Sequence, residues 1–204
     1  MKSKIKALVN LIMVLVSLPF YGNYRLFSIF ISKRKAFSSM MQWVSLFPGI
    51  FGEWLRRGVL QWVTGRSLEN CCICFGSLFS DPNIIIEKGV YLGPGCNVGK
   101  ATLGQNTIIG SGVHITSGLR QHGISDSNIP IRDQEGQFDR VHIGKNCWIG
   151  NGAMVCADIG NGSVVGAGSV VVKPIPDYSL VTGNPAQILR SRKTDQSKPF
   201  GPLS

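Results

Sequence analysis

Imidazole groups can move a proton in either direction near neutral pH, and this chain has three, on His114, His122 and His142. His114 and His142 each stand directly before an aliphatic residue of a regular pattern, so we expect both to point outward from strands. His122 lies in the irregular segment 117–123, where a loop can present a side chain to a cleft. A base there could take a hydroxyl proton as the oxygen attacks an activated carbonyl. A lone loop histidine is more often simply solvated, so the surrounding elements decide.

A six-residue periodicity surrounds His122. An aliphatic residue, usually followed by glycine, returns every six positions with one shortened step in each of two blocks. The non-repeating insert 116–140, which holds His122, separates the blocks. The aliphatic positions are Ile86, Leu92, Val98, Leu103, Ile109 and Ile115, then Ile143, Ile149, Val155, Ile159, Val165 and Val171.

A period of six fits neither an amphipathic helix nor a long alternating strand. It indicates a parallel β-helix, in which each hexad forms a short strand and a corner and three hexads close one triangular coil. We expect about four coils with neighbouring strands roughly 4.8 Å apart, and positive φ angles at the glycines beside the aliphatic residues. Small side chains should fill the remaining interior space at Val90, Cys96, Thr107, Val113 and Cys147.

Several motifs lie on this repeat: Trp148-Ile149-Gly150, the stretch VGAGS at 165–169, and Gly183-Asn184-Pro185-Ala186 before Arg190. With the interrupting His-bearing insert, they resemble the hexapeptide-repeat O-acetyltransferases of the maltose, galactoside and polysaccharide type over residues 71–192. The resemblance implies an all-β, left-handed parallel β-helix, an exception to the right-handed crossover rule. It also implies acetyl-CoA as co-substrate, no metal, a sugar or glycan acceptor, and a homotrimer.

The resemblance carries particular roles to particular residues. It makes His122 the general base, facing a groove of a neighbouring chain, and directs Lys173 and Arg190 to the coenzyme A phosphates. No Cys or Ser beside His122 suits a covalent carrier, so direct transfer is expected. Residues 120–140 would choose the acceptor.

Other candidates have two interpretations each. Backbone N–H groups near Asn151, Gly152 and Ala167 could donate to the thioester or the pantetheine arm. Trp148 either borders the cleft or is an exposed strand aromatic. Asp126 and Glu135 could orient the imidazole, although acids in a polar loop need no function.

The basic character of the chain belongs to its N-terminal third. Residues 1–66 contain ten Lys or Arg and one acid, whereas residues 67–204 contain eleven bases and ten acids. This distribution favours an anionic membrane surface as partner and argues against nucleic acid.

The apolar runs 7–21 and 26–31 are each shorter than the roughly 20 residues that span a bilayer. We expect a re-entrant or interfacial hairpin bent near Pro19, with both ends cytoplasmic; a single span is the main alternative.

A second apolar and basic stretch, 36–65, contains an amphipathic helix. It is either a cap on the end of the β-helix or a helix in the membrane interface with its arginines on the phosphates. Its apolar face comprises Phe51, Trp54, Leu55, Val59, Trp62 and Val63, opposite Glu53, Arg56, Arg57 and Gln61.

The six cysteines are interpreted as buried free thiols of a reducing compartment. Cys71, Cys72 and Cys74 have no downstream partner pair at zinc spacing, whereas Cys96 and Cys147 fall on small-residue steps of the repeat. The gaps of eight and twenty residues between the histidines argue against the three-histidine zinc site of a γ-class carbonic anhydrase.

The sequence therefore predicts three parts: a membrane-associated region 1–70, a repeat domain 71–192 with the insert 116–140, and a flexible tail 193–204. We expect an acetyl-CoA-dependent O-acetyltransferase at the cytoplasmic face of the inner membrane, with a lipid-linked polysaccharide precursor as one fitting acceptor. Serine O-acetyltransferase, or another acetyltransferase of small molecules, is an alternative of close chemistry. A catalytically silent membrane scaffold is the alternative that is not an enzyme.

Overall fold

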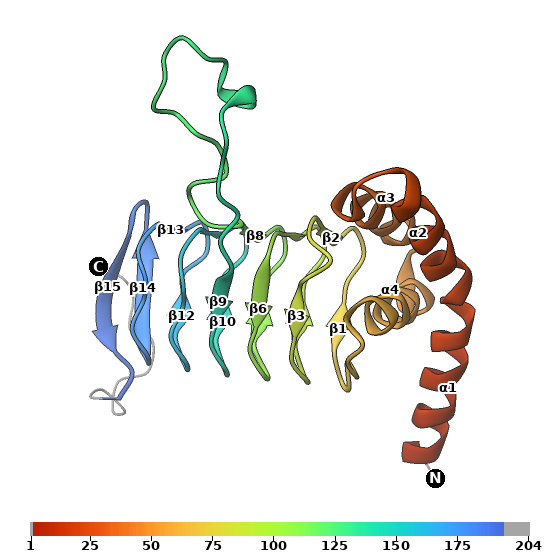
Figure 1. The fold of residues 1–204 in the computed structure, drawn as a ribbon. Helices are drawn as coiled ribbons and strands as arrows, with labels where there is room; N and C mark the ends of the chain where they lie inside the picture. The colour runs from red at the N-terminus through yellow and green to blue at the C-terminus, as the bar shows by residue number, and fades with distance from the viewer. Residues whose placement is uncertain (1, 194–204) are drawn as a thin grey trace.

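The computed structural model describes residues 2–193: a helical region, then a β-helix from which one long loop projects (Figure 1). The helices are α1 (Lys2–Val16), α2 (Leu18–Phe30), α3 (Lys33–Ser45) and α4 (Gly49–Thr64). Of the tail expected at 193–204, all but Lys193 lies outside the described residues.

Three sheets form the faces of the prism, and all their neighbouring strands are parallel except β15, which pairs antiparallel with β14. The largest contains β1 (Cys72–Ile73), β4 (Tyr91–Leu92), β7 (Ile108–Ile109), β10 (Trp148–Ile149), β12 (Val164–Val165), β14 (Ser179–Gly183) and β15 (Ala186–Ser191). The second contains β2 (Leu78–Phe79), β5 (Asn97–Val98), β8 (His114–Ile115), β11 (Met154–Val155) and β13 (Val170–Val171). The third contains β3 (Ile85–Ile86), β6 (Ala101–Leu103) and β9 (Val141–Ile143), and single bridges at Ile159 and Ile175 extend it.

The prism has five coils rather than the predicted four, because the second sheet contains five strands, one per coil. Ile73 and Phe79 supply the first two inward residues of the extra coil, and both are almost fully buried. The pattern hides them because neither is followed directly by glycine. Ile86, the predicted start of the repeat, is the last inward residue of this first coil.

The aliphatic positions and the small residues between them are buried in the prism interior, as the period of six predicts. The expected positive φ at the glycines beside the aliphatic residues is wrong. Positive φ occurs two positions later in the corner, at residues such as Gly95 and Asn106. The earlier glycines are needed because the coils approach closely: a Cβ on Gly150 would lie 2.4 Å from the backbone nitrogen of Ala167 in the next coil.

The cysteines divide into two groups. Cys71, Cys96, Cys147 and Cys156 are buried, in accord with the prediction. Cys72 and Cys74 are only half-buried, because both lie on the outward side of the first coil, where their sulfur atoms are 3.6 Å apart.

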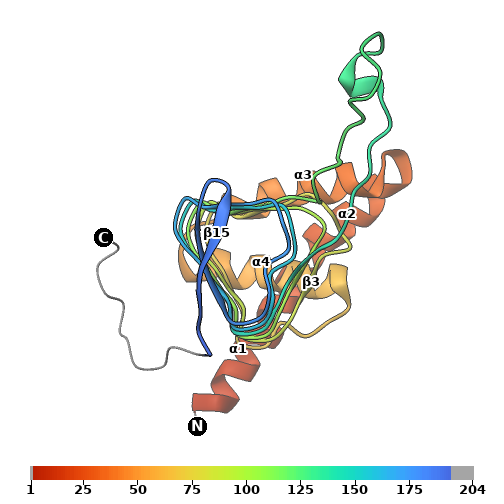
Figure 2. The ribbon, with the colours of Figure 1, turned by 90° about the vertical axis from the view of Figure 1, so that its left-hand side faces the viewer.

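Helices α3 and α4 cover the first coil, so the cap interpretation of α4 describes its packing (Figures 1 and 2). The expected polar face of this helix is wrong at its two arginines: Arg56 is fully buried and Arg57 nearly so. The Arg56 guanidinium donates to the carbonyl oxygens of Val44 and Phe47 at the end of α3, at 3.1 and 2.8 Å, and to that of Ile73 in β1, at 2.9 Å. Carbonyl groups left over at a helix end need such donors.

The chain does not fold back near Pro19, as the expected hairpin requires. Figures 1 and 2 show α2 continuing away from α1, and the reversal comes at Ile31 and Ser32, after which α3 packs along α2. Pro19 instead lies in the first turn of α2, a position that tolerates its missing N–H. The combined helical segment 8–30 is long and apolar enough to cross a membrane, with a mean hydropathy of 1.2 and 17% of its apolar window buried.

Candidate active site

The insert 116–140 projects from the corner between β8 and β9 (Figures 1 and 2). Its outgoing and returning strands are irregular segments outside the β-sheets, and residues Ile131–Asp133 form a short 3-10 helix. At its base the Asp139 N–H donates to the Ser117 carbonyl at 3.0 Å, and the Gln137 N–H donates to the Arg120 carbonyl at 2.6 Å. An ion pair of 3.0 Å joins the Arg120 guanidinium to the Asp139 carboxylate across the two strands. The stem of the loop is therefore ordered by bonds between its own strands.

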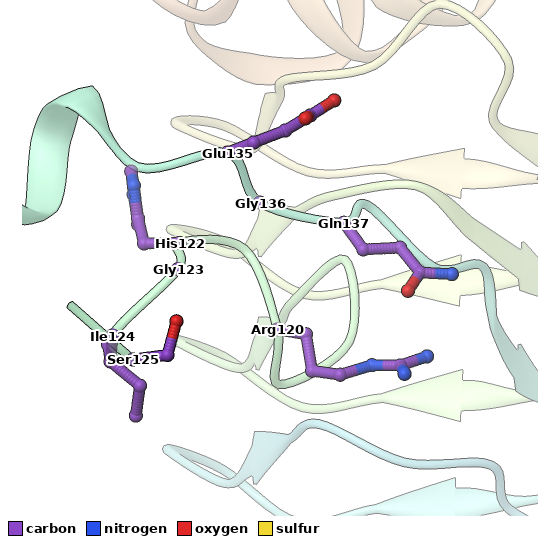
Figure 3. Close-up of a pocket in the computed structure, with 8 residues that line it drawn as sticks. All are labelled: Arg120, His122, Gly123, Ile124, Ser125, Glu135, Gly136 and Gln137. Atoms are coloured by element: carbon purple, nitrogen blue, oxygen red, sulfur yellow. The ribbon is translucent and has the colours of Figure 1, made fainter.

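His122 lies where these two strands touch most closely. A Cβ on Gly136 would lie 2.0 Å from the carbonyl oxygen of Gln121, and one on Gly123 would lie 2.8 Å from that of Glu135. Two glycines thus permit a contact that larger residues would prevent. The contact shapes a pocket of about 570 Å³ lined by Arg120, His122, Gly123, Ile124, Ser125, Glu135, Gly136 and Gln137 (Figure 3).

The imidazole of His122 is exposed and borders this pocket. In Figure 3 the side chain of Glu135 leaves the opposite strand and points away from the imidazole. The carboxylate of Asp126 accepts from the Asn128 N–H at 2.8 Å, which closes a local turn. Asp126 therefore stabilises a turn within the loop, and the Glu135 carboxylate is not directed at the imidazole.

A second group of candidate residues lies at the corner between β10 and β11. Asn151 accepts a hydrogen bond from the Ser111 N–H through its Oδ1 at 2.9 Å, and the Gly152 N–H donates to the Ser111 carbonyl at 2.9 Å. One coil further on the equivalent residue is Ala167, which has no side-chain acceptor. Within residues 2–193 no hydrogen bond engages the backbone N–H of Asn151 or of Ala167. These two groups, rather than Gly152, can donate to a ligand.

Trp148 lies on the outward side of the largest sheet and is 49% exposed. Its register partner on β7 is Ile108, whose partner on β4 is Tyr91, and both are also exposed. The three side chains form an apolar strip that runs along the prism axis. The sequence contains the signal for it, because each of these residues stands directly before an inward aliphatic residue.

The two cationic candidates lie toward the C-terminal end of the prism. Lys173 is exposed and follows β13, and Arg190 lies on β15 opposite Leu180 of β14. A single chain does not gather all the candidates, because the insert 116–140, which contains His122, projects away from the prism faces (Figures 1 and 2).

The structure adds Arg120 and Gln137 to the candidates around His122. The sequence assigns acceptor choice to residues 120–140 as a whole and singles out neither. Gly123 and Gly136 were the available signal, since glycines facing each other in an insert indicate a close approach of its two strands.

The other two histidines lie on different faces of the prism. His114 is on β8 of the second sheet and His142 on β9 of the third, and both are exposed. In the described part of the chain no group of three or more His, Cys, Asp or Glu side chains is arranged to hold a metal ion.

The six-residue steps of this β-helix are the structural form of a hexapeptide repeat. The sequence model of a family described as "Hexapeptide repeat of succinyl-transferase" matches residues 140–173. WbbJ of Escherichia coli K12, whose assigned name proposes O-acetyl transfer in lipopolysaccharide biosynthesis, is 34% identical over 122 residues, which are 56% of this chain and 61% of that protein. SACOL2570 of Staphylococcus aureus COL, whose name proposes an acetyltransferase, is 49% identical over 57 residues, 27% of this chain and 29% of that protein.

Among solved structures, a maltose O-acetyltransferase from Clostridium difficile 630 has a TM-score of 0.54 at 21% identity, over 79% of this chain and 89% of that one. The likeness concerns the fold and fits a left-handed β-helix. These matches confirm the resemblance to the hexapeptide-repeat O-acetyltransferases. The chain spans less than two thirds of the length of the two curated relatives described here.

Proposed function

We propose that this protein is an acetyl-CoA-dependent O-acetyltransferase that modifies a sugar or glycan, with His122 as general base. The observation that carries the proposal is the exposed His122 on a loop that interrupts a hexapeptide repeat. The similarity to WbbJ supports an O-acetyl transfer and a polysaccharide-type acceptor.

The proposed reaction is a direct transfer. His122 takes the proton of the acceptor hydroxyl while its oxygen forms a bond to the thioester carbonyl carbon. The carbon–sulfur bond then breaks, and the departing thiolate receives the proton from the imidazolium. The products are the O-acetyl ester and coenzyme A.

The corner of Asn151 and Ala167 suits the arm of coenzyme A. Its two backbone N–H groups without partners in the described chain can donate to the thioester oxygen or to the amides of the pantetheine arm. The cations Lys173 and Arg190 are proposed for the phosphates. Trp148, three residues before Asn151, would border this corner with an exposed apolar surface.

We propose a homotrimer because the candidates are divided between the loop and the prism. A neighbouring chain can bring its Asn151 and Ala167 to His122, whereas in one chain the insert 116–140 projects away from the prism (Figure 1). The strip formed by Tyr91, Ile108 and Trp148, with Met154 on the second sheet, is apolar surface of the kind that self-association buries.

The helical region is proposed to hold the protein on the cytoplasmic face of the inner membrane. Exposed apolar side chains cover α1, α2 and the adjoining ends of α3 and α4, and Ile29 and Phe30 are 75% and 77% exposed. The basic run Lys33-Arg34-Lys35 directly follows them. Such a border between apolar and basic surface suits the headgroup layer, and acetyl-CoA and a lipid-linked acceptor could meet there without crossing the bilayer.

Mass spectrometry of cellular glycans tests this function. Cells with the intact protein should contain a glycan about 42 mass units heavier than its unmodified form, because one acetyl group replaces a hydroxyl hydrogen. Cells with His122→Ala protein should lack this heavier glycan. Glycans identical in both strains, with equal amounts of folded protein, would oppose the proposal.

A further inference from the structure

A contact between the helical region and the stem of the His122 loop has no place in the function described so far. The guanidinium of Arg34, in the first turn of α3, lies over the ring of Phe138 at 4.0 Å from its centroid. Phe138 belongs to the returning strand of the loop. The contact therefore joins the N-terminal helices to the insert across a gap of more than one hundred residues in sequence.

An ion pair holds Arg34 in this position. Its Nε lies 3.5 Å from Oδ2 of Asp81, whose side chain is only 5% exposed. The other carboxylate oxygen of Asp81 accepts from the backbone and side-chain amides of Asn83, at 2.9 and 3.0 Å. Moving Arg34 away would leave a buried carboxylate without its cation, so Arg34 remains over Phe138.

Phe138 in turn is close to the pocket wall. The next residue before it, Gln137, lines the pocket and donates its N–H to the Arg120 carbonyl. The residue before that, Gly136, packs against the backbone of Gln121 and of His122. A displacement of the Phe138 ring would therefore be transmitted along two residues to the contact that sets the position of His122.

Two further cations join the same strand to the prism. The ammonium of Lys100 donates to the Phe138 carbonyl at 3.2 Å. The Arg140 guanidinium donates to the carbonyls of Ala101 and Asn83 at 2.9 and 2.8 Å. Lys100 thus holds the backbone of the stem and the Arg140 side chain joins the end of the stem to the prism, whereas Arg34 contacts a ring and connects it to α3.

We propose that Arg34 is a positioning residue for the His122 loop, and that the helical region thereby sets the orientation of the candidate base. Its role in catalysis rests on the proposed function, whereas its role in loop order does not. Since Arg34 stands four residues after the exposed Phe30, the surface proposed to meet the membrane and the loop are parts of one connected unit.

Amide hydrogen exchange on the full chain in detergent tests the positioning role without any activity. The amides to follow are those of Gln137 and Asp139, whose hydrogen bonds close the stem. In Arg34→Ala they should exchange roughly 3- to 10-fold faster, the effect expected when a half-buried cation–π contact is lost. Phe138→Leu, a change in the loop that leaves the helices intact, should produce a similar increase. In the double variant Arg34→Ala with Phe138→Leu, the exchange rates should be close to those of either single variant, because both changes remove the same contact.

The matched control is Arg25→Ala, which removes an exposed arginine of α2 that stacks on Tyr21. It should leave the Gln137 and Asp139 amides unchanged. Equal exchange in wild-type, Arg34→Ala and Phe138→Leu protein would overturn the proposal. So would faster exchange in Arg34→Ala that extended equally to prism amides such as that of Met154, because it would show a general loss of stability.

Kinetics form the second arm. Arg34→Ala and Phe138→Leu should lower kcat, or raise KM for the acceptor, by a similar 3- to 10-fold factor, and KM for acetyl-CoA should stay unchanged. Arg34→Lys keeps a charge for Asp81 but loses the planar group that stacks on the ring. Its kcat or acceptor KM should therefore lie between the values for wild-type and Arg34→Ala protein. Absence of acetyl transfer by the wild-type protein would contradict the proposed function alone, and the exchange result would still decide the positioning role.

Discussion

The buried guanidinium of Arg56 allows a direct test of how the helices are joined to the β-helix. Arg56→Ala removes three hydrogen bonds, 2.8 to 3.1 Å long, from its Nε and Nη1 to the carbonyls of Phe47, Ile73 and Val44. Each buried carbonyl left without a partner costs roughly 1–3 kcal/mol. Removing the charge offsets part of this loss of stability, because the buried guanidinium is itself costly to desolvate. Burial lowers the pKa of Arg56, and one of its nitrogens has no hydrogen-bond partner in the described chain.

We therefore expect a net loss of about 3–5 kcal/mol in the free energy of unfolding, close to that for breaking other buried ionic sites. For a chain of this length that is a fall in Tm of roughly 6–20 °C. Circular dichroism of the full chain in mild detergent, with heat or urea, measures both. Arg56→Lys should recover only part of the loss, because one ammonium cannot reach both the end of α3 and β1.

Arg66→Ala is the matched control, since Arg66 is exposed just after α4, and it should change stability by less than about 0.5 kcal/mol. The interpretation of Arg56 as a ligand of membrane phosphates predicts the opposite pattern. Normal stability of Arg56→Ala, combined with weaker binding to anionic vesicles, would refute the packing described here.

Three further predictions concern pH, the donor and the membrane. Burial raises the pKa of Cys96 to about 11 from 9.0, so stability should fall as the pH rises from 9 to 11, and Cys96→Ala should remove up to about 1.4 kcal/mol per pH unit of this slope in urea titrations. Lys173→Ala with Arg190→Ala should raise KM for acetyl-CoA in initial-rate assays and leave kcat nearly unchanged, because the phosphates lie far from the reacting carbon. Ile29→Ser with Phe30→Ser should reduce sedimentation with anionic vesicles and spare acetylation of a small soluble acceptor, because neither side chain is in the core.

Each of these changes has a control within the chain. Val113→Ala alters another interior position without a titrating group, so its cost should not depend on pH. Lys88→Ala removes an exposed lysine near the opposite end of the prism and should leave KM for acetyl-CoA unchanged. Ile188→Ser with Leu189→Ser removes exposed apolar groups from β15 and should not alter vesicle binding. Equal effects of a change and its control would contradict the corresponding prediction.

The sequence was most informative where one physical requirement repeats. An inward aliphatic side chain every six residues is enforced by the triangular coil, so residues such as Leu92 and Ile149 could be placed without a structure. The repeat domain was predicted to begin at residue 71, but the register of its first coil could not be read because neither Ile73 nor Phe79 is followed by glycine, and the coil count was one too low.

The helical region was harder, because amphipathicity does not reveal which partner covers a face. Arg56 occupies a polar position of α4 in sequence, yet it donates to carbonyl groups at the end of α3. No periodicity in the sequence predicts this pairing. The reversal after Phe30 rather than at Pro19 has a similar origin, since proline is compatible with the first turn of a helix.

The site was predicted in part. The irregular insert and the outward position of Trp148 follow from the break and the register of the repeat. The stem contacts of Phe138 do not, because Arg34, which lies over its ring, and Lys100, which donates to its carbonyl, come from distant parts of the chain. Tertiary contacts of this kind leave no local signature in sequence.

The rate of acetyl transfer by His122→Ala protein tests the central claim most directly. Purified full-length protein is given labelled acetyl-CoA and a lipid-linked glycan extract, and the label that appears in base-labile ester is followed with time. We expect His122→Ala to lower the rate by roughly 10² to 10⁴, the usual effect of removing a positioned base, while His114→Ala and His142→Ala, on the exposed prism faces, retain it. A folded His122→Ala protein that transfers acetyl groups at the wild-type rate would contradict the account.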